Sequence, residues 1–253
     1  MDIKGKKAII VGGASGMANS SAAMLKERGA EIAILDLPTS AGEAVNKELG
    51  GVGFFPVNVM DDEATEAAIN GAAEALGGIH ISVNTAGGGI GKRTLTREGP
   101  HPIDEFRQCI ELNLISAFNI SRLAADHMSR NEPEDEERGV IINTASIAAF
   151  EGQIGQVAYT AAKAGIAGMC LTMARDLGSL GIRALAIAPS LFGTGLTKGI
   201  PEEFEKALTK DAAFPKRMGR PEEYAKLVCA IVDNPMLNGQ CLRLDAGQRF
   251  APK

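Results

Sequence analysis

Short apolar segments that alternate with helical stretches constrain the fold of this chain most strongly. Seven such segments recur, at 7–11, 31–35, 53–57, 79–83, 140–144, 182–187 and 241–244. Stretches with helical periodicity lie between them, at 17–28, 42–49, 61–76, 103–130 and 158–177. Nearly continuous apolar strands that alternate with helices are typical of a parallel sheet covered on both faces. We therefore predict an α/β fold, a doubly wound parallel sheet of about seven strands.

No linker, repeat or change in composition divides the chain, so we expect one domain over residues 1–253. The net charge of −5 argues against a protein that holds nucleic acid by bulk positive charge. The first apolar segment begins by Ala8, which leaves no room for a signal peptide, and no stretch stands out as a membrane span of about 20 apolar residues. We expect a cytoplasmic protein, with the mitochondrial matrix as the alternative for a eukaryotic source.

The cysteine and histidine residues have no spacing typical of a metal site or a redox pair. This statement covers Cys109, Cys170, Cys229, Cys241, His80, His101 and His127. We expect no bound metal and reduced, mostly buried thiols.

A glycine-rich turn joins the first predicted strand to the first predicted helix. Gly12, Gly13 and Gly16 occupy this turn, where glycine lets the backbone approach a pyrophosphate at a helix N-terminus. Asp36 ends the second strand, at the position from which an acid accepts hydrogen bonds from both ribose hydroxyls. Ala18 replaces the third glycine of the usual pattern, at a point where the helix and the strand pack closely. We expect its extra methyl group to cause a slight displacement there without loss of binding. Together these features predict a Rossmann-like dinucleotide site.

The residues after Asp36 distinguish between the two common dinucleotides. Leu37, Pro38, Thr39 and Ser40 follow it, and none of them carries a positive charge that would neutralise a 2′-phosphate. The sequence therefore favours NAD over NADP.

A serine, a tyrosine and a lysine have a spacing that brings their polar groups to one point. Tyr159 and Lys163 are four residues apart within a predicted helix, so they share one helix face. Ser146 lies thirteen residues before Tyr159, at the end of a predicted strand. A hydroxyl, a phenol and an ammonium aimed at one point suit hydride transfer at a secondary alcohol. Tyr224 has no lysine four residues on, and we expect it to have a packing role.

These motifs resemble those of the short-chain dehydrogenase/reductase family over the whole chain. The resemblance rests on the glycine turn, Asn84-Thr-Ala-Gly87, Asn113, Ser146, Tyr159-x-x-x-Lys163 and Pro189-Ser-Leu-Phe-Gly-Thr194. Longer segments, such as LDLPTSAGEA, GVIINTASIAAFEGQIGQVAY and NGQCLRLDAGQR, are similar to the type 2 3-hydroxyacyl-CoA dehydrogenase group, also known as type 10 17β-hydroxysteroid dehydrogenases.

The resemblance implies a catalytic role for four residues. Tyr159 would be the general base, and Ser146 would hydrogen-bond the substrate oxygen. Lys163 would hold the nicotinamide ribose, and Asn113 would fix a water that links Lys163 to solvent. A phenol has a pKa near 10, and we expect Lys163 and the positive nicotinamide ring to lower it toward neutrality.

The resemblance also assigns cofactor contacts along the strand ends. Asn58 stands where the family usually has an acid, Thr85 where many members have asparagine, and Ser190 where they have glycine. The full set of predicted cofactor residues is Gly12, Ser15, Gly16, Met17, Asp36, Asn58, Val59, Thr85, Ala86, Gly87, Tyr159, Lys163, Pro189, Phe192 and Thr194.

Three loops are expected to form the substrate side, at about 87–102, 148–156 and 191–215. Ser146, Gln153, Tyr159 and Leu191 are the predicted substrate contacts, and Lys92, Arg93 and Arg97 are candidates for binding CoA phosphates.

The resulting hypothesis is a reversible NAD-dependent oxidation of (S)-3-hydroxyacyl-CoA to 3-ketoacyl-CoA, an activity of fatty acid metabolism, by a homotetramer. A hydroxysteroid or general secondary-alcohol dehydrogenase is the alternative within enzymes. A non-catalytic nucleotide-binding scaffold subunit is the alternative from another class.

Overall fold

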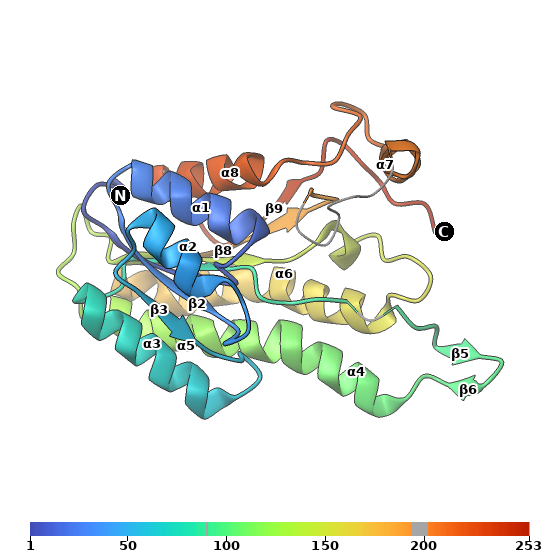
Figure 1. The fold of residues 1–253 in the computed structure, drawn as a ribbon, viewed down its shortest axis with the longest axis horizontal. Helices are drawn as coiled ribbons and strands as arrows, with labels where there is room; N and C mark the ends of the chain where they lie inside the picture. The colour runs from blue at the N-terminus through green and yellow to red at the C-terminus, as the bar shows by residue number, and fades with distance from the viewer. Residues whose placement is uncertain (90, 194–201, 253) are drawn as a thin grey trace.

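Seven parallel strands form the central sheet of the computed structural model, which describes residues 1–89, 91–193 and 202–252 (Figure 1). The strands lie in the order β3-β2-β1-β4-β7-β8-β9. Their bounds are β1 (Lys7–Val11), β2 (Glu31–Asp36), β3 (Gly53–Pro56), β4 (Ile81–Asn84), β7 (Gly139–Thr144), β8 (Ile182–Pro189) and β9 (Cys241–Leu244). The strand order reverses between β1 and β4, which is where open α/β sheets bind ligands, beyond the carboxyl ends of the strands. The predicted fold class is confirmed.

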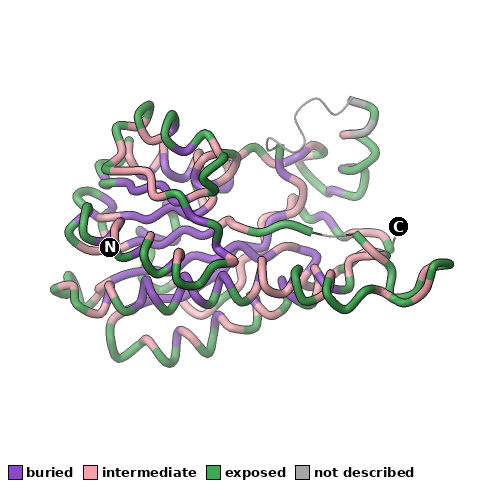
Figure 2. The backbone as a smooth tube through the Cα atoms, turned by 60° about the horizontal axis from the view of Figure 1, so that its bottom comes forward, coloured by how far each residue is buried: buried purple, intermediate pink, exposed green. Residues whose placement is uncertain are grey.

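Helices cover both faces of this sheet, as Figure 1 shows. One face carries α1 (Gly16–Glu27), α2 (Gly42–Leu49) and α8 (Pro221–Asp233), and the other carries α3 (Asp62–Leu76), α5 (Ser116–Met128) and α6 (Val157–Leu177). Neighbouring strand residues alternate between the two layers: Ile10 and Ile34 pack toward α1 and α8, whereas Ile9 and Leu35 pack toward α3 and α5. The strands therefore form the buried centre of the molecule, and the outer helix surfaces are exposed (Figure 2).

The helix predicted over 103–130 is three consecutive segments. α4 (Ile103–Ile110) leads into a π-helical turn (Glu111–Ile115), which continues as α5. A π turn inserts one residue into the helical ladder and is frequent at functional sites. Periodicity alone does not reveal it, because the apolar pattern continues through the turn.

All three predicted substrate loops contain some regular structure, and in 148–156 it is the end of a short 3-10 helix (Ile147–Ala149). A two-stranded hairpin, β5 (Leu95–Thr96) and β6 (Gly99–Pro100), lies within 87–102 and projects from the body of the molecule (Figure 1). α7 (Glu202–Thr209) lies within 191–215, so that segment is not a plain loop. α8 is not among the helices predicted from the periodicity, although Glu223 accepts a hydrogen bond from the backbone N–H of Arg220 and marks the start of the helix.

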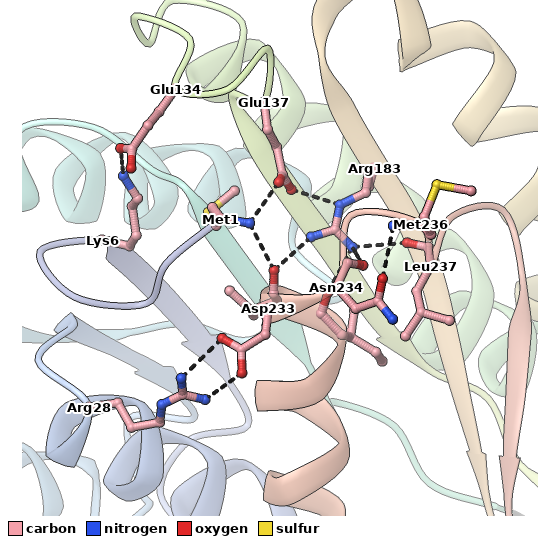
Figure 3. Close-up of polar contacts among 12 residues, drawn as sticks. Met1, Lys6, Arg28, Glu134, Glu137, Arg183, Asp233, Asn234, Met236 and Leu237 are labelled. Atoms are coloured by element: carbon pink, nitrogen blue, oxygen red, sulfur yellow. Dashed lines mark hydrogen bonds and ion pairs between the residues drawn. The ribbon is translucent and has the colours of Figure 1, made fainter.

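Charged pairs hold the amino ends of the strands, as Figure 3 shows. Arg183, at the start of β8, is almost fully buried and donates through Nε to Glu137 at 2.7 Å. Its guanidinium also donates to four backbone carbonyls at the end of α8 and just after it, those of Ile231, Val232, Asn234 and Leu237. Lys6 pairs with Glu134 in front of β1. The Arg183 contacts fasten the end of α8 to the amino end of β8, at the end of the sheet opposite the predicted site.

Length and mean hydropathy alone would allow residues 157–180, which include α6, to cross a membrane, and the sequence analysis did not single out this segment. In the structure, α6 packs along β8, with Ile166 and Cys170 buried against Ala186 and Ala188. It also carries two of the predicted catalytic residues, Tyr159 and Lys163. α6 is thus one of the three helices that cover this face of the sheet, packed against β8 along one side.

Candidate active site

The predicted catalytic residues come from three elements that meet at the carboxyl edge of the sheet. Ser146 follows β7 in extended conformation, and its hydroxyl accepts a hydrogen bond from the Ala148 N–H at 3.1 Å. Tyr159 and Lys163 lie one turn apart near the start of α6, and Asn113 lies in the π turn. The spacing read from the sequence therefore brings these side chains to one region.

Lys163 is a buried cation held by a backbone carbonyl. Its side chain is almost fully buried, and Nζ donates to the carbonyl oxygen of Thr144 at 2.9 Å. Nζ also lies 5.6 Å from the centre of the Tyr159 ring. Burial lowers the pKa of Lys163 to about 8, because the charged form loses its hydration. An ammonium has three N–H donors, so the bond to Thr144 leaves capacity for a ribose hydroxyl.

The pKa of Tyr159 moves in the direction opposite to the one expected. Burial raises it, and the hydrogen bond with Ser146 opposes this rise only in part. Lys163 Nζ lies 5.6 Å from the centre of the Tyr159 ring, and a cation near a phenolate acts to lower its pKa. A positively charged nicotinamide ring at the site would act in the expected, lowering direction.

Asn113 fixes the glycine segment that follows β4. Its Nδ2 donates to the carbonyls of Gly88 at 2.8 Å and Cys109 at 2.9 Å, and its Oδ1 accepts from the Gly88 N–H at 3.1 Å. A side chain at Gly87, whose φ is +149°, would place Cβ 2.5 Å from Asn113 Oδ1 and 3.2 Å from Lys163 Nζ. Gly87, Asn113 and Lys163 are thus directly adjacent. The water-binding role of Asn113 stays a prediction.

The turn after β1 fits the phosphates of a dinucleotide. Gly12 has φ +80°, and a Cβ there would lie 2.7 Å from Thr85 Oγ1 and 3.3 Å from the Ala86 nitrogen, so only glycine allows the two strand ends to approach. The Ser15 side chain does not cap α1, and the first turn of α1 carries no acid. The free N–H groups in the first turn of α1 and the positive end of the helix dipole are therefore suited to binding an anion.

Asp36 lies beside this turn at the end of β2. Its Oδ2 accepts a hydrogen bond from the Ala14 N–H at 2.9 Å, and its Oδ1 accepts from the Leu37 N–H at 2.7 Å. The carboxylate is thus fixed against the glycine turn and keeps lone pairs for a diol. These residues fit the phosphate and ribose portions of a dinucleotide.

The remaining predicted cofactor residues lie around these groups. Asn58 is exposed and its Oδ1 accepts from the Met60 N–H, while Val59 is buried. Met17 packs against the core, and Pro189 is buried at the end of β8. Phe192 is buried with its ring edge-on to Tyr224. Thr194 lies outside the described residues. Gly16 begins α1, and Ala86 is bound through its N–H to Asn84 Oδ1.

The predicted substrate contacts are distributed less tightly. Gln153 donates from Nε2 to the carbonyl of Ala251 at 3.2 Å, which ties the 148–156 loop to the C-terminal segment. Leu191 is half-buried after β8. Lys92, a candidate for CoA phosphates, forms an ion pair with Glu105 at 2.7 Å. That pairing leaves less of its charge for a phosphate than the sequence analysis assumed.

Three residues outside the predicted set of site residues help to build the site, and one of them, Asn84, belongs to a motif already noted in the sequence. Thr144 holds Lys163 through its backbone carbonyl, Asn84 fixes the Ala86 N–H, and Cys109 accepts from Asn113 through its carbonyl. Asn84 had a signal, since it opens the Asn-Thr-Ala-Gly motif. The other two contacts use backbone oxygens, which every residue carries.

Comparisons with known proteins agree with this geometry. The family model for short chain dehydrogenase matches residues 6–205. The chain is 46% identical over 254 residues to 3-hydroxyacyl-CoA dehydrogenase type-2 of Bos taurus, covering 99% of this chain and 97% of that protein.

Solved structures give the same result. The crystal structure of 3-hydroxyacyl-CoA dehydrogenase type-2 from Mycobacterium avium is 40% identical, with a TM-score of 0.94 over 98% of both chains. A 7α-hydroxysteroid dehydrogenase complexed with NADH and 7-oxo glycochenodeoxycholic acid is 29% identical, with a TM-score of 0.88 over 99% of this chain and 97% of that one. The predicted family is confirmed: this chain belongs to the short-chain dehydrogenase family.

Proposed function

We propose that this chain catalyses the reversible NAD-dependent oxidation of an (S)-3-hydroxyacyl-CoA to the 3-ketoacyl-CoA. The observation that carries the proposal is the 46% identity to the bovine 3-hydroxyacyl-CoA dehydrogenase type-2 along almost the whole of both chains. The placement of Ser146, Tyr159 and Lys163 at one point supports it, because oxidation of a secondary alcohol needs a base at the hydroxyl and a cation near that base.

The side chains divide the reaction among them. In oxidation, the Tyr159 phenolate oxygen takes the proton of the substrate hydroxyl as the carbinol carbon loses its hydride, and in the reverse direction the resulting Tyr159 hydroxyl returns that proton. Ser146 donates a hydrogen bond to the substrate oxygen, which bears developing negative charge. Lys163 stabilises the Tyr159 phenolate across the short distance between them. The cofactor, when bound, supplies the hydride acceptor and a positive ring.

The cofactor class is a nicotinamide dinucleotide, and Asp36 supports NAD as the specific form. Its carboxylate would accept from the ribose diol and repel a 2′-phosphate, and like charges brought together at a binding surface cost several kcal/mol. We expect kcat/KM with NAD to exceed that with NADP by at least about 100-fold. Asp36→Ala should narrow the ratio, with Asp62→Ala on α3 as the matched control. Equal use of both cofactors by the wild type would contradict the assignment.

The substrate class is tested by comparing three kinds of alcohol under one condition. CoA phosphates and the pantetheine arm bind away from the reacting carbon, and such remote binding energy can orient it. We expect a short-chain 3-hydroxyacyl-CoA to have a kcat/KM at least about tenfold above the matching pantetheine thioester and above a hydroxysteroid. The structural similarity to a 7α-hydroxysteroid dehydrogenase supports the second candidate, a hydroxysteroid or general alcohol dehydrogenase. Equal turnover of steroid and thioester would favour that candidate, and no turnover of any alcohol would favour a scaffold subunit.

Further parts of the proposal concern assembly and contacts. We propose one domain over residues 1–253, a homotetramer and a cytoplasmic location, and light scattering of the purified protein tests the assembly. Gln153 and Leu191 would contact the substrate. Arg93 and Arg97, both exposed next to the projecting hairpin, are stronger candidates for the CoA phosphates than Lys92. Rising salt should then raise KM for the CoA substrate more than KM for a steroid.

A further inference from the structure

Tyr224 lies far from the reacting groups in sequence and directly behind them in the fold. It occupies the first turns of α8, is completely buried, and places its hydroxyl 2.7 Å from Oγ1 of Thr144 at the end of β7. A packing role explains the burial of the ring. It does not explain why a buried ring carries a hydroxyl that reaches the strand that holds Lys163.

The direction of this hydrogen bond follows from counting protons. Thr144 Oγ1 donates its one proton to the carbonyl oxygen of Asn84 at 2.7 Å. It therefore has no proton for Tyr224, so the Tyr224 hydroxyl donates to Thr144 Oγ1. Tyr224 is thus the first donor in a chain that continues through Thr144 to Asn84, whose Oδ1 holds the Ala86 N–H at 3.0 Å.

Thr144 carries this chain to the catalytic lysine. Its backbone carbonyl accepts the 2.9 Å hydrogen bond from Lys163 Nζ, while its side chain is fixed between Tyr224 and Asn84. The Thr144 hydroxyl therefore belongs to the buried network, and the Thr144 carbonyl binds the ammonium. A carbonyl fixed in this way presents its dipole to Lys163 without reorganisation during the reaction.

The ring of Tyr224 supports a second wall of the site. It meets Phe192 edge-on, with ring centres 6.4 Å apart and planes at 87°. The segment around Phe192 is paired with Gly219 through backbone hydrogen bonds of 2.8 Å and 2.9 Å, just before α8 begins. The Tyr224 side chain thus contacts both Thr144, which holds Lys163, and Phe192, which is one of the predicted cofactor residues.

We propose that Tyr224 is a positioning residue of the dehydrogenase reaction: its hydroxyl fixes Thr144 so that the Thr144 carbonyl holds the Lys163 ammonium beside Tyr159. This inference rests on the proposed function, because it assigns Tyr224 an effect on the Tyr159 base. Within the described residues, the titratable groups that face Lys163 are Tyr159 on α6 and Cys109 on α4, and both stay unchanged in the variants below.

The test removes each hydroxyl of the chain in turn. Tyr224→Phe keeps the ring and loses the donor, Thr144→Val loses the connection, and Thr144→Ser keeps it. Thr65→Val is the matched control, since Thr65 is a buried threonine on α3 whose hydroxyl bonds the Asp61 carbonyl. We expect Tyr224→Phe and Thr144→Val to lower kcat by about 3- to 10-fold, with KM for the cofactor changed by less than about twofold.

Two pH measurements separate positioning from packing. A less fixed carbonyl stabilises the ammonium less, so NMR of lysine labelled at Nζ should show a lower pKa for Lys163 in both variants without cofactor, with Lys163→Met identifying the signal. Weaker support of the phenolate should move the acid limb of kcat/KM for alcohol oxidation to higher pH by about 0.5 unit. The double variant should move it no further, because both changes cut one chain. Thr144→Ser and Thr65→Val should keep the wild-type profile.

Unchanged profiles and an unchanged Lys163 pKa in Tyr224→Phe, with only a lower melting temperature, would overturn the proposal and leave a packing residue. Should Tyr224→Phe yield no folded protein, Thr144→Val decides on the same criteria. The Lys163 pKa is measured without substrate, so its outcome stands even if the wild type oxidises none of the alcohols tested, a result that would contradict the proposed function instead.

Discussion

A buried positive charge lies at each end of the strands, and the two are paired differently. We call the end where the strands begin the amino edge and the end where they finish the carboxyl edge. At the amino edge, Arg183 is buried and forms an ion pair with Glu137, and its remaining donors bind backbone carbonyls. At the carboxyl edge, Lys163 is buried as deeply, but its bond runs to the neutral carbonyl of Thr144. Within residues 1–89, 91–193 and 202–252, no carboxylate forms an ion pair with Lys163.

This difference separates a group that holds the fold from a group that serves the reaction. A buried cation that is paired with an anion costs less free energy than an unpaired one. Removing one partner of the pair leaves the other charge buried without compensation, which destabilises the fold. Burial without a counter-charge lowers the pKa of a cation, as it does for Lys163. Perturbed pKa values of this kind are typical of functional sites. The absent counter-charge at the carboxyl edge is what a phenolate would supply during turnover.

The largest expected effect belongs to the carboxyl edge. Tyr159→Phe keeps the ring and removes the group that takes the proton, so kcat should fall by roughly 100- to 10,000-fold. Cofactor affinity, measured by NADH fluorescence titration, should stay nearly unchanged because the packing is conserved. Circular dichroism should show that the variant is folded. Turnover within about threefold of the wild type would show that Tyr159 is not the base.

The next effect belongs to the amino edge and should spare catalysis. Arg183→Met leaves Glu137 still paired with the N-terminal ammonium of Met1 and removes the donor to four backbone carbonyls. Breaking a buried pair costs about 3 to 5 kcal/mol in the free energy of unfolding, and because the Met1 pair remains we expect a loss near the lower end, about 3 kcal/mol. Arg28→Met is the control, because the pair of Arg28 with Asp233 is partly exposed and such pairs contribute at most about 1 kcal/mol. Urea unfolding measures both. If Arg183→Met lowers kcat of the folded enzyme as strongly as it lowers stability, the two edges are not separate in function.

The two edges also differ in how far the sequence reveals them. Strand positions, the glycine turn and the Tyr159–Lys163 pair were predicted correctly as to place, because local spacing decides which face a side chain occupies. The network around Arg183 was not predicted, since its partners are carbonyls at the end of α8 and just after it, which become acceptors only when that helix packs against β8. The π turn at Asn113 and the raised pKa of Tyr159 likewise depend on tertiary burial. The residue type identifies a candidate reacting group in the sequence. The backbone carbonyls that hold such a group cannot be identified in this way, because every residue carries one.

The smallest expected effect tests the carboxyl edge without any substrate. The pKa of Lys163 is about 8 in the folded chain and near its ordinary value of 10.5 when unfolded. Between these two values the unfolded state binds more protons, so stability from this group rises with pH and is lost as pH falls through 8. The Lys163→Met variant lacks this titrating group, so it lacks this pH dependence.

The difference in unfolding free energy, wild type minus Lys163→Met, should therefore increase from pH 7 to pH 9.5 by about 1 to 2 kcal/mol. Subtracting the variant removes the contributions of groups common to both proteins, including the buried cysteines Cys170 and Cys241, whose raised pKa values act in the opposite direction. Urea unfolding at five pH values, without cofactor, measures the difference. A difference that stays flat would mean that Lys163 keeps an ordinary pKa despite its burial, and that the carboxyl edge stores no uncompensated charge for the reaction to use.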